Sequence, residues 1–241
     1  MITALLQGGM SNQMFQIAAI TSLAIDNNDE AVFDFNRCYT PLQGYPASKY
    51  ADSIFSKVPR GEVKSFSVQC PAEFTYAPLI YIRDAAYSGY FQSEKYFKHN
   101  SKAIRELFDI KPLFYSSNYT TLHVRRGDYL KNPHIHPTCS IEYYEKALSM
   151  VRGEVFVFSD DIEWAKDNLK NKRLHFVEDK DEIESFRLMA GATNSIISNS
   201  SFSWWAAWLR VNNGITIAPE VWFGPDGPNY SDVVPESWIK I

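Results

Sequence analysis

Two arginines beside an aspartate form the densest cluster of functional side chains, His-Val-Arg-Arg-Gly-Asp-Tyr at 123–129. The cluster begins in a short apolar stretch that predicts a strand, and the alternation of a strand places His123 and Arg125 on one side and Arg126 on the other. Guanidinium groups at a strand end can bind phosphate oxygens through two parallel hydrogen bonds, and Asp128 can hold one of them in place. The alternative is a structural Arg–Asp pair beside a buried histidine. Because paired charges of this kind are common at functional sites, we favour a site.

A second cluster, Ser-Asn-Ser-Ser-Phe-Ser at 198–203, lies between a predicted strand and a predicted helix. Hydroxyls and unpaired backbone N–H groups at a helix start can bind an anion, although serines there also serve as ordinary N-caps. A diphosphate bound between Ser200-Ser201 and Arg125 would combine the two clusters into one site. The tryptophans that follow are expected to lie in the core: Trp204, Trp205 and Trp208.

Two further clusters carry weaker signals. Ser-Asp-Asp at 159–161 starts a predicted helix, where one carboxylate can accept hydrogen bonds from a guanine or ribose edge or simply cap the helix. Gly8 and Gly9 end the first predicted strand, and such a turn can let the backbone approach a ligand. The turn matches neither the dinucleotide-binding nor the Walker glycine pattern. Ser11 and Asn12, which follow it, are expected to cap a helix.

Metal-dependent chemistry has little support in the sequence. The Asp-x-Asp pattern of metal-dependent nucleotide-sugar transferases occurs at Asp179-Lys180-Asp181, inside a charged run that we expect to be the solvated start of a helix. Arginines and a helix dipole can stabilise a departing diphosphate without a metal. The sequence has no Gly-x-Ser-x-Gly or His-Glu-x-x-His motif, which argues against a serine hydrolase or a metalloprotease. We therefore expect neither a metal ion nor a cofactor.

Strands and helices alternate regularly in the second part of the chain. This alternation predicts right-handed crossovers and a parallel, Rossmann-like sheet. Ligands of such sheets bind at the carboxyl ends of the strands, where the clusters above are expected to lie. The expected strands are 120–124, 154–158, 173–177, 195–197 and 214–218, and the expected helices are 141–150, 161–169, 181–190 and 201–211.

The first part of the chain opens as a strand, a glycine turn, a helix and a second strand at 31–35. The aromatic-rich run at 87–97 is expected to lie mostly in a core, and a short helix is expected at 101–108. We predict an α/β protein with two Rossmann-like halves, 1–115 and 116–241, and a cleft between them. The C-terminal tail is expected to pack back over a neighbouring part of the chain.

Composition excludes several classes of protein. The 241 residues include 45% hydrophobic and 22% charged residues, and the net charge is −4, so neither disorder nor non-specific nucleic-acid binding is expected. Three widely spaced cysteines, Cys38, Cys70 and Cys139, predict free thiols rather than a zinc site or a disulfide framework. No apolar run is long enough for a transmembrane helix, and the first residues lack the features of a signal peptide. We therefore expect a cytoplasmic protein. The sequence does not indicate its oligomeric state.

Taken together, these motifs resemble those of the α-1,2-fucosyltransferases of glycosyltransferase family 11. They occur in the family's order and span nearly the whole chain. The resemblance rests on the segments 8–18, 89–97, 123–129, 156–161, 198–209 and 222–224.

The resemblance implies a GT-B-like fold in which the second half binds GDP-β-L-fucose and the first half binds the acceptor. It also implies transfer to the 2-hydroxyl of a terminal galactose, with inversion and without a metal. Arg125 would bind the β-phosphate, beside Arg126, and His123 would lie near the nucleotide. The other residues with implied roles are Asp161 for guanine or ribose, Ser200, Ser201 and the amide of Phe202 for phosphate, and Asn12 beside Gly8 and Gly9 for closing over the donor.

The general base stays open at this point. Asp128 is a candidate for catalysis together with Arg125, but an arginine can engage its carboxylate. His134, His136 and Asp34 are other candidates. The chain is also shorter than expected for the family, mainly within 36–99. A GDP-sugar-binding or glycan-binding protein without turnover, or a transferase for another GDP-sugar such as GDP-mannose, is therefore an alternative.

Overall fold

The computed structural model describes residues 1–37, 44–61, 68–69, 74–116 and 118–241, which form two compact units. The first unit contains Met1–Ile110 and Asn229–Pro235, and the second contains Lys111–Pro228 and Glu236–Ile241. The chain therefore passes between the units three times.

The division differs from the expected boundary after residue 115. Residues 111–115 belong to the second unit, where the Leu113 N–H donates to the Arg187 carbonyl at 3.2 Å and the Tyr119 hydroxyl donates to the Leu113 carbonyl, also at 3.2 Å. These bonds attach residues 111–115 to the second unit. Part of the C-terminal tail, by contrast, belongs to the first unit.

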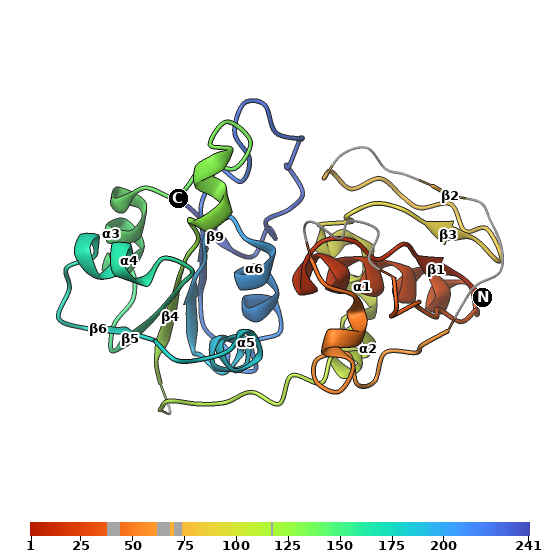
Figure 1. Ribbon diagram of the computed structural model, residues 1–241, viewed down its shortest axis with the longest axis horizontal. Coiled ribbons are helices and arrows are strands. Elements are labelled where there is room, and N and C mark those ends of the chain that lie inside the picture. Colours follow the sequence, from red (N-terminus) through yellow and green to blue (C-terminus); the bar gives the residue numbers. More distant parts are fainter. Residues whose placement is uncertain (38–43, 62–67, 70–73, 117) are drawn as a thin grey trace. The chain divides into compact units, whose positions relative to one another are not determined.

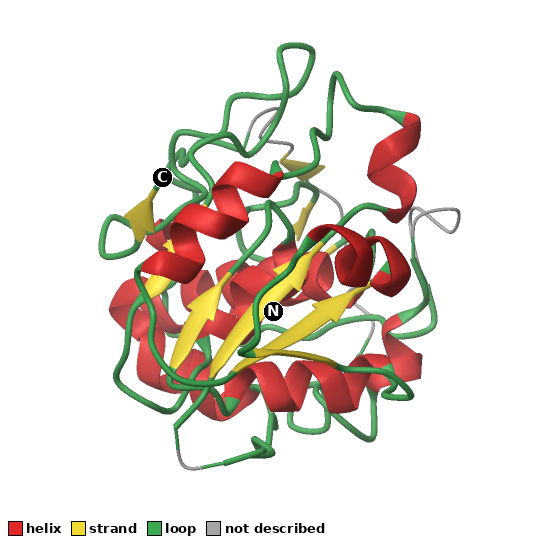
Figure 2. Ribbon diagram, turned by 90° about the vertical axis from the view of Figure 1, so that its left-hand side faces the viewer, coloured by secondary structure: helices red, strands yellow, loops and turns green. Residues whose placement is uncertain are grey.

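The second unit is built on a six-stranded parallel sheet (Figure 1). The strand order is β6-β5-β4-β7-β8-β9, which is the 3-2-1-4-5-6 order of the doubly wound dinucleotide-binding sheet. Figure 2 shows several of its strands running in one direction. The predicted α/β class and parallel sheet are confirmed. The strands are β4 Thr120–Val124, β5 Val155–Ser159, β6 Leu174–Phe176, β7 Asn194–Ile196, β8 Thr216–Ala218 and β9 Ile239–Lys240.

Helices cover both faces of this sheet, with α3 and α4 on one face and α5 and α6 on the other (Figure 1). Leu122 and Val124 of β4 pack in the core cluster that includes Tyr144 of α3 and Ala165 of α4. The strand alternation therefore directs His123 toward the opposite face, as predicted. The helices are α3 Ile141–Ser149, α4 Ile162–Asn168, α5 Glu182–Ala190 and α6 Ser201–Trp208.

The expected strands and helices between 118 and 218 are all present, with ends that shift by up to three residues. Asp161, Asp181 and Ser200 each accept a hydrogen bond from a backbone N–H in the first turn of the helix that follows. The tryptophans of α6 are buried, as expected of core residues: Trp204, Trp205 and Trp208.

The first unit contains a long helix and a small parallel sheet of two-residue strands in the order β1-β3-β2. The expected strand at 31–35 is wrong as an extended element. Ala31 forms an isolated bridge with Ile2, and Phe33 forms one with Arg60. Because the two bridges have different partners, no ladder develops. The elements are β1 Thr3–Ala4, α1 Met10–Asp26, β2 Val68–Gln69, β3 Ala86–Tyr87 and α2 Ser101–Leu107, with 3-10 turns η1 Ala47–Tyr50, η2 Glu94–Tyr96 and η3 Lys98–Asn100.

Helix α1 begins earlier than the sequence predicted. Its N-cap is Gly9, and the Asn12 and Gln13 N–H groups both donate to the Gly9 carbonyl. Gly8 has a φ of +75°, a conformation that glycine adopts without strain, and it turns the chain two residues before the helix begins at Met10. Ser11 and Asn12 therefore lie inside the first turn and do not cap it.

The aromatic run at 87–97 is mainly core. Its buried members are Tyr87, Phe91, Tyr96 and Phe97, and Tyr90 is half-buried. Among the described residues, no helix has both the length and the apolar character that crossing a membrane requires.

Candidate active site

His123 and Ser198 join the two strongest sequence clusters. The His123 Nδ1 lies 2.7 Å from the Ser198 Oγ, and both side chains are buried. His123 lies near the end of β4, and Ser198 follows the neighbouring strand β7. The strand order of the sheet reverses between these two strands, where ligands of such folds bind. Burial, followed by the positive charge of Arg125, lowers the pKa of His123 to about 3, so the imidazole is neutral.

Arg125 lies between two carboxylates. Its Nη2 is 2.6 Å from the Asp128 Oδ1, and its Nη1 is 3.0 Å from the Asp160 Oδ2. The guanidinium carbon also lies 5.4 Å from the centre of the Tyr129 ring. The contact that the sequence suggested between Asp128 and an arginine is present. About a third of the Arg125 side chain, 34%, stays exposed and can meet a ligand.

Asp160 is a site residue that the sequence reasoning missed. Its Oδ1 accepts the Arg126 N–H at 2.9 Å while its other oxygen pairs with Arg125. A Cβ on Gly127 would lie 2.6 Å from that other oxygen, so the absence of a side chain at Gly127 leaves room for the carboxylate. The register of the sheet could have revealed this position, because Val124 of β4 pairs with Ser159 of β5 and the next residues are Arg125 and Asp160.

Arg126 belongs to a second ion pair. Its Nε lies 3.1 Å from the Asp161 Oδ2, and its guanidinium carbon lies 3.8 Å from the centre of the Trp164 ring. The Asp161 Oδ1 accepts the Trp164 N–H at the start of α4. Both oxygens of Asp161 therefore have protein partners, and its expected role toward guanine or ribose stays a prediction.

Ser200, Ser201 and Phe202 lie together at the start of α6. The Ser200 Oγ accepts the Phe202 N–H at 3.3 Å, which is the ordinary capping role that we considered as an alternative. The Phe202 ring lies 5.7 Å from the His123 ring, so this helix start and the end of β4 are adjacent. Phosphate binding by these residues stays a prediction.

Asn199 fixes the turn that carries these serines. Its Nδ2 donates to the Pro137 carbonyl at 2.8 Å and to the Trp222 carbonyl at 2.9 Å. Its own carbonyl accepts the Tyr129 hydroxyl at 2.9 Å. Three separate segments therefore hold the turn in place. The sequence offered Asn199 within a motif but did not indicate these long-range partners.

The candidate bases have different surroundings. The His136 ring stacks on the Tyr129 ring at 4.8 Å, and burial lowers the pKa of His136, with Asp128 raising it and Arg125 lowering it further. Asp34 belongs to the first unit, where it pairs with Arg37. Asp128 is the candidate that contacts Arg125 directly, and 66% of its side chain is exposed.

Gly8, Gly9 and Asn12 belong to the first unit, whereas Arg125 belongs to the second. The Asn12 Oδ1 accepts the Gln92 Nε2 at 2.8 Å, which connects two of the sequence motifs. The Gln13 Nε2 donates to the Gly8 carbonyl at 3.0 Å, so this buried glutamine fixes the glycine turn.

Within the described residues, no three His, Cys, Asp or Glu side chains are grouped so that they could hold a metal ion. Burial raises the pKa of the Cys139 thiol to about 11. Cys38 and Cys70 lie outside the described residues. The expected helix start in the acidic run is present, because Asp181 caps α5.

Comparison with known proteins gives a match over the whole chain. Residues 1–241 match the model of glycosyl transferase family 11. An alpha-1,2-colitosyltransferase of Escherichia coli is 31% identical and covers 100% of this chain and 98% of its own length. The O-antigen biosynthesis glycosyltransferase WbnK of Escherichia coli is 29% identical, covering 98% of this chain and 99% of its own. The colitosyltransferase alignment runs over 286 positions, so this relative carries segments that the 241-residue chain lacks.

Two further likenesses are more limited. A galactoside alpha-(1,2)-fucosyltransferase 2 of Rattus norvegicus is 31% identical over 52% of this chain and 40% of its own. The crystal structure of the fucosyltransferase NodZ from Bradyrhizobium superposes with a TM-score of 0.50 at 13% identity, covering 85% of this chain and 91% of that one. At this identity the likeness concerns the fold, and it agrees with the expected GT-B-like class.

Proposed function

The chain belongs to glycosyl transferase family 11, as its motifs predicted, and we propose that it transfers L-fucose from GDP-β-L-fucose to the 2-hydroxyl of a terminal galactose with inversion. The observation that carries this proposal is the contact between His123 and Ser198, which brings the Arg125 strand end beside the start of α6. The Arg125 guanidinium and the N-terminus of α6 lie where the strand order reverses between β4 and β7. Together they suit the diphosphate of a nucleotide sugar.

Arg125 and the start of α6 would act on the leaving group. As the bond between fucose C1 and the β-phosphate oxygen breaks, the electron pair stays on that oxygen as GDP departs. Donors already in place for this developing charge stabilise the transition state more than the ground state. Because the pKa of His123 is about 3, its imidazole is neutral and serves to orient the Ser198 hydroxyl rather than to bind phosphate as a cation.

The two carboxylates on Arg125 would then have different roles. Asp160 is held by both Arg125 and the Arg126 backbone, so it stays in place and orients the guanidinium. Asp128 is more exposed and contacts Arg125 through one oxygen. The donor phosphate displaces the Asp128 carboxylate from the Arg125 Nη2. The released carboxylate then accepts the proton of the acceptor hydroxyl while the hydroxyl oxygen bonds to fucose C1.

A metal ion is not needed for this chemistry, because arginine and helix-start donors carry the charge that a cation would otherwise balance. The proposed donor set in the second unit consists of Arg125, Arg126, His123 and Asp161 with the start of α6. The proposed acceptor site lies on the first unit.

A second donor sugar is supported by one comparison. A relative that aligns with this whole chain is named a colitosyltransferase. Colitose lacks the 3-hydroxyl of fucose, and a site that hydrogen-bonds this hydroxyl discriminates strongly against its loss.

The test is a competition in which equal amounts of GDP-fucose, GDP-colitose and GDP-mannose react with one galactoside. A product whose mass corresponds to added fucose supports the proposal, and a colitosyl or mannosyl product, or GDP binding without any product, contradicts it.

A further inference from the structure

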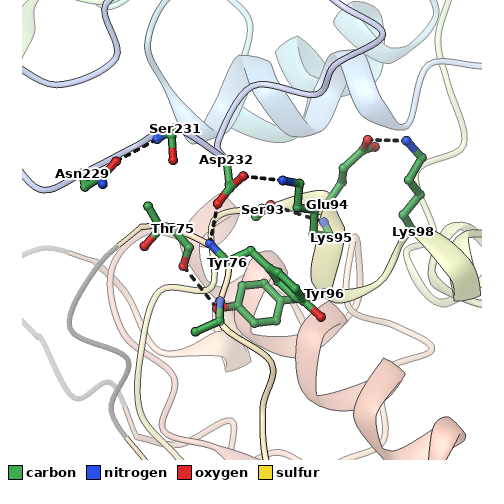
Figure 3. Close-up of polar contacts among 11 residues, drawn as sticks. Thr75, Tyr76, Ser93, Glu94, Lys95, Tyr96, Lys98, Asn229, Ser231 and Asp232 are labelled. Carbon is green, nitrogen blue, oxygen red and sulfur yellow. Dashed lines mark hydrogen bonds and ion pairs between the residues drawn. The ribbon is translucent and has the colours of Figure 1, made fainter.

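The C-terminal strap, residues 229–235, belongs to the first unit although the chain before and after it belongs to the second. Val233 and Val234 are buried and anchor the strap by apolar contact. Asp232, immediately before them, is directed toward two other segments of the first unit (Figure 3). A polar residue on a strap with buried anchors is well placed to fix its neighbours.

Asp232 uses both of its oxygens. The Oδ1 lies 2.5 Å from the Lys95 Nζ, and the Oδ2 accepts the Tyr76 N–H at 2.9 Å. Burial raises the pKa of Asp232, but the hydrogen bonds from Lys95 and the Tyr76 N–H outweigh this effect and lower the pKa overall. The carboxylate is therefore charged at neutral pH and connects the strap to the segments around Tyr76 and Lys95.

The Tyr76 ring packs against a buried ring and is partly exposed. It packs against the Tyr96 ring edge to face, with the ring centres 4.9 Å apart, and Tyr96 is buried. The Tyr96 hydroxyl accepts the Ala77 N–H at 3.2 Å, which fixes the backbone at the next residue as well. Tyr76 nevertheless keeps 38% of its surface exposed. Its ring is thus held in one place while part of it faces outward.

Further aromatic side chains lie close along the same segments. Phe74, two residues before Tyr76, stacks on Tyr90 with the ring centres 5.3 Å apart. A hexose has one face of C–H groups that packs on an aromatic ring and hydroxyls that bond to charged groups. The Tyr76 ring offers the first kind of contact. The ion pair of Asp232 and Lys95, which is bonded to the Tyr76 backbone N–H, offers charged groups for the second.

We propose that Asp232 is a positioning residue that holds Tyr76 as a stacking platform for the acceptor sugar. The proposal rests on the proposed function, because it supplies the acceptor contact of the same transfer. A partly exposed ion pair adds little to the stability of the fold, so the main effect of the Asp232 contacts is the placement of Tyr76.

The variants separate the two oxygens of Asp232. Asp232→Ala removes both contacts, Asp232→Asn keeps an oxygen for the Tyr76 N–H, and Lys95→Met removes the ion pair alone. Ser231→Ala, on the exposed neighbouring residue of the strap, is the matched control. We expect Asp232→Ala to raise the acceptor KM about tenfold or more. Asp232→Asn and Lys95→Met should raise it less, and the Kd for GDP and the kcat should stay close to those of the wild type.

Tyr76 itself provides the second arm. Tyr76→Ala should raise the acceptor KM at least as much as Asp232→Ala, and Tyr76→Phe should raise it less because the ring is kept. Saturation-transfer NMR with methyl β-galactoside measures acceptor binding without turnover. A galactoside signal that is lost in Tyr76→Ala and weakened in Asp232→Ala supports the platform.

The outcomes distinguish the inference from the proposed function. A wild-type protein that transfers no fucose but binds the galactoside through Tyr76 overturns the proposed function and supports the platform. An active wild type whose acceptor KM is unchanged in Asp232→Ala and Tyr76→Ala overturns the platform alone. If GDP affinity and kcat fall in Asp232→Ala by the same factor by which the acceptor KM rises, the contact is merely structural and the platform is overturned. A wild type that binds no galactoside also overturns the platform.

Discussion

His123 and Ser198 are 75 positions apart in the sequence, yet their Nδ1 and Oγ atoms lie 2.7 Å apart at the carboxyl ends of neighbouring parallel strands. The contact exists because β4 and β7 pair at the point where the strand order reverses. It gives the second unit one site, in which the arginines that follow β4 lie beside the serine-rich start of α6.

Replacement of Arg125 tests the charge that the site supplies. Arg125→Ala should lower kcat about a hundred- to a thousandfold, because a donor aimed at developing charge is lost. Arg125→Lys should keep only part of the wild-type kcat, since lysine keeps the positive charge but lacks the two parallel N–H donors of the guanidinium. Steady-state kinetics measure both, with Arg152→Ala on an exposed residue of the same unit as control. Unchanged turnover in Arg125→Ala would remove Arg125 from the mechanism.

The two carboxylates on Arg125 should give opposite effects on donor binding. Asp128→Asn should lower kcat about a hundredfold or more, because the proton acceptor is lost. The same variant should bind GDP-fucose at least as tightly as the wild type, since the phosphate has one fewer carboxylate to displace. Asp160→Asn should weaken donor binding, because Arg125 loses its fixed partner. Calorimetric titration with GDP-fucose measures both effects. Weaker binding by Asp128→Asn would be evidence against displacement of the Asp128 carboxylate from Arg125 by the donor phosphate.

Gly127→Ala should reproduce the effect of Asp160→Asn. A Cβ at this position would lie 2.6 Å from the Asp160 Oδ2, so the carboxylate must move away from Arg125. Gly61→Ala is the control, because its Cβ would meet Val32 at an ordinary 3.5 Å. GDP affinity and the free energy of unfolding are the measurements. Full GDP affinity in Gly127→Ala would show that Asp160 does not position Arg125.

The buried, neutral His123 predicts a pH dependence of stability. Its pKa of about 3 in the folded protein lies below the value of 6.5 expected in the unfolded chain, so the unfolded state binds more protons between these pH values. The free energy of unfolding should therefore fall as the pH drops below about 6.5, by about 2 kcal/mol at pH 5 from this residue. Urea unfolding across this range should show the loss. His123→Asn should remove it, and His175→Gln, at a half-exposed ring, should not. An equal slope in His123→Asn would contradict a neutral His123.

Sequence periodicity predicted the second unit well between 118 and 218, because each strand and helix in that stretch carries its own apolar pattern. Strand β9 escaped prediction, since the two residues Ile239–Lys240 are too few to show periodicity and become a strand by pairing with β8. The family resemblance gave a role to Asp161 and none to Asp160. The register between β4 and β5, which places Asp160 beside Arg125, is a property of the folded sheet that the sequence does not display.

In the first unit, long-range contacts decide what local signals cannot. Gly9 caps α1, although Ser11 and Asn12 are the better capping residues, because the turn at Gly8 sets where the helix begins. The contact between Asp232 and the Tyr76 N–H spans 156 positions, and no local pattern indicates it.

The most direct test of the account is transfer from GDP-fucose to a β-galactoside in the presence of EDTA, with the linkage of the product determined by NMR. The account predicts a product whose new bond joins fucose C1 in the α configuration to the galactose 2-hydroxyl, formed at the same rate with and without EDTA. A product with retained β configuration, another linkage, or turnover that EDTA abolishes would contradict it.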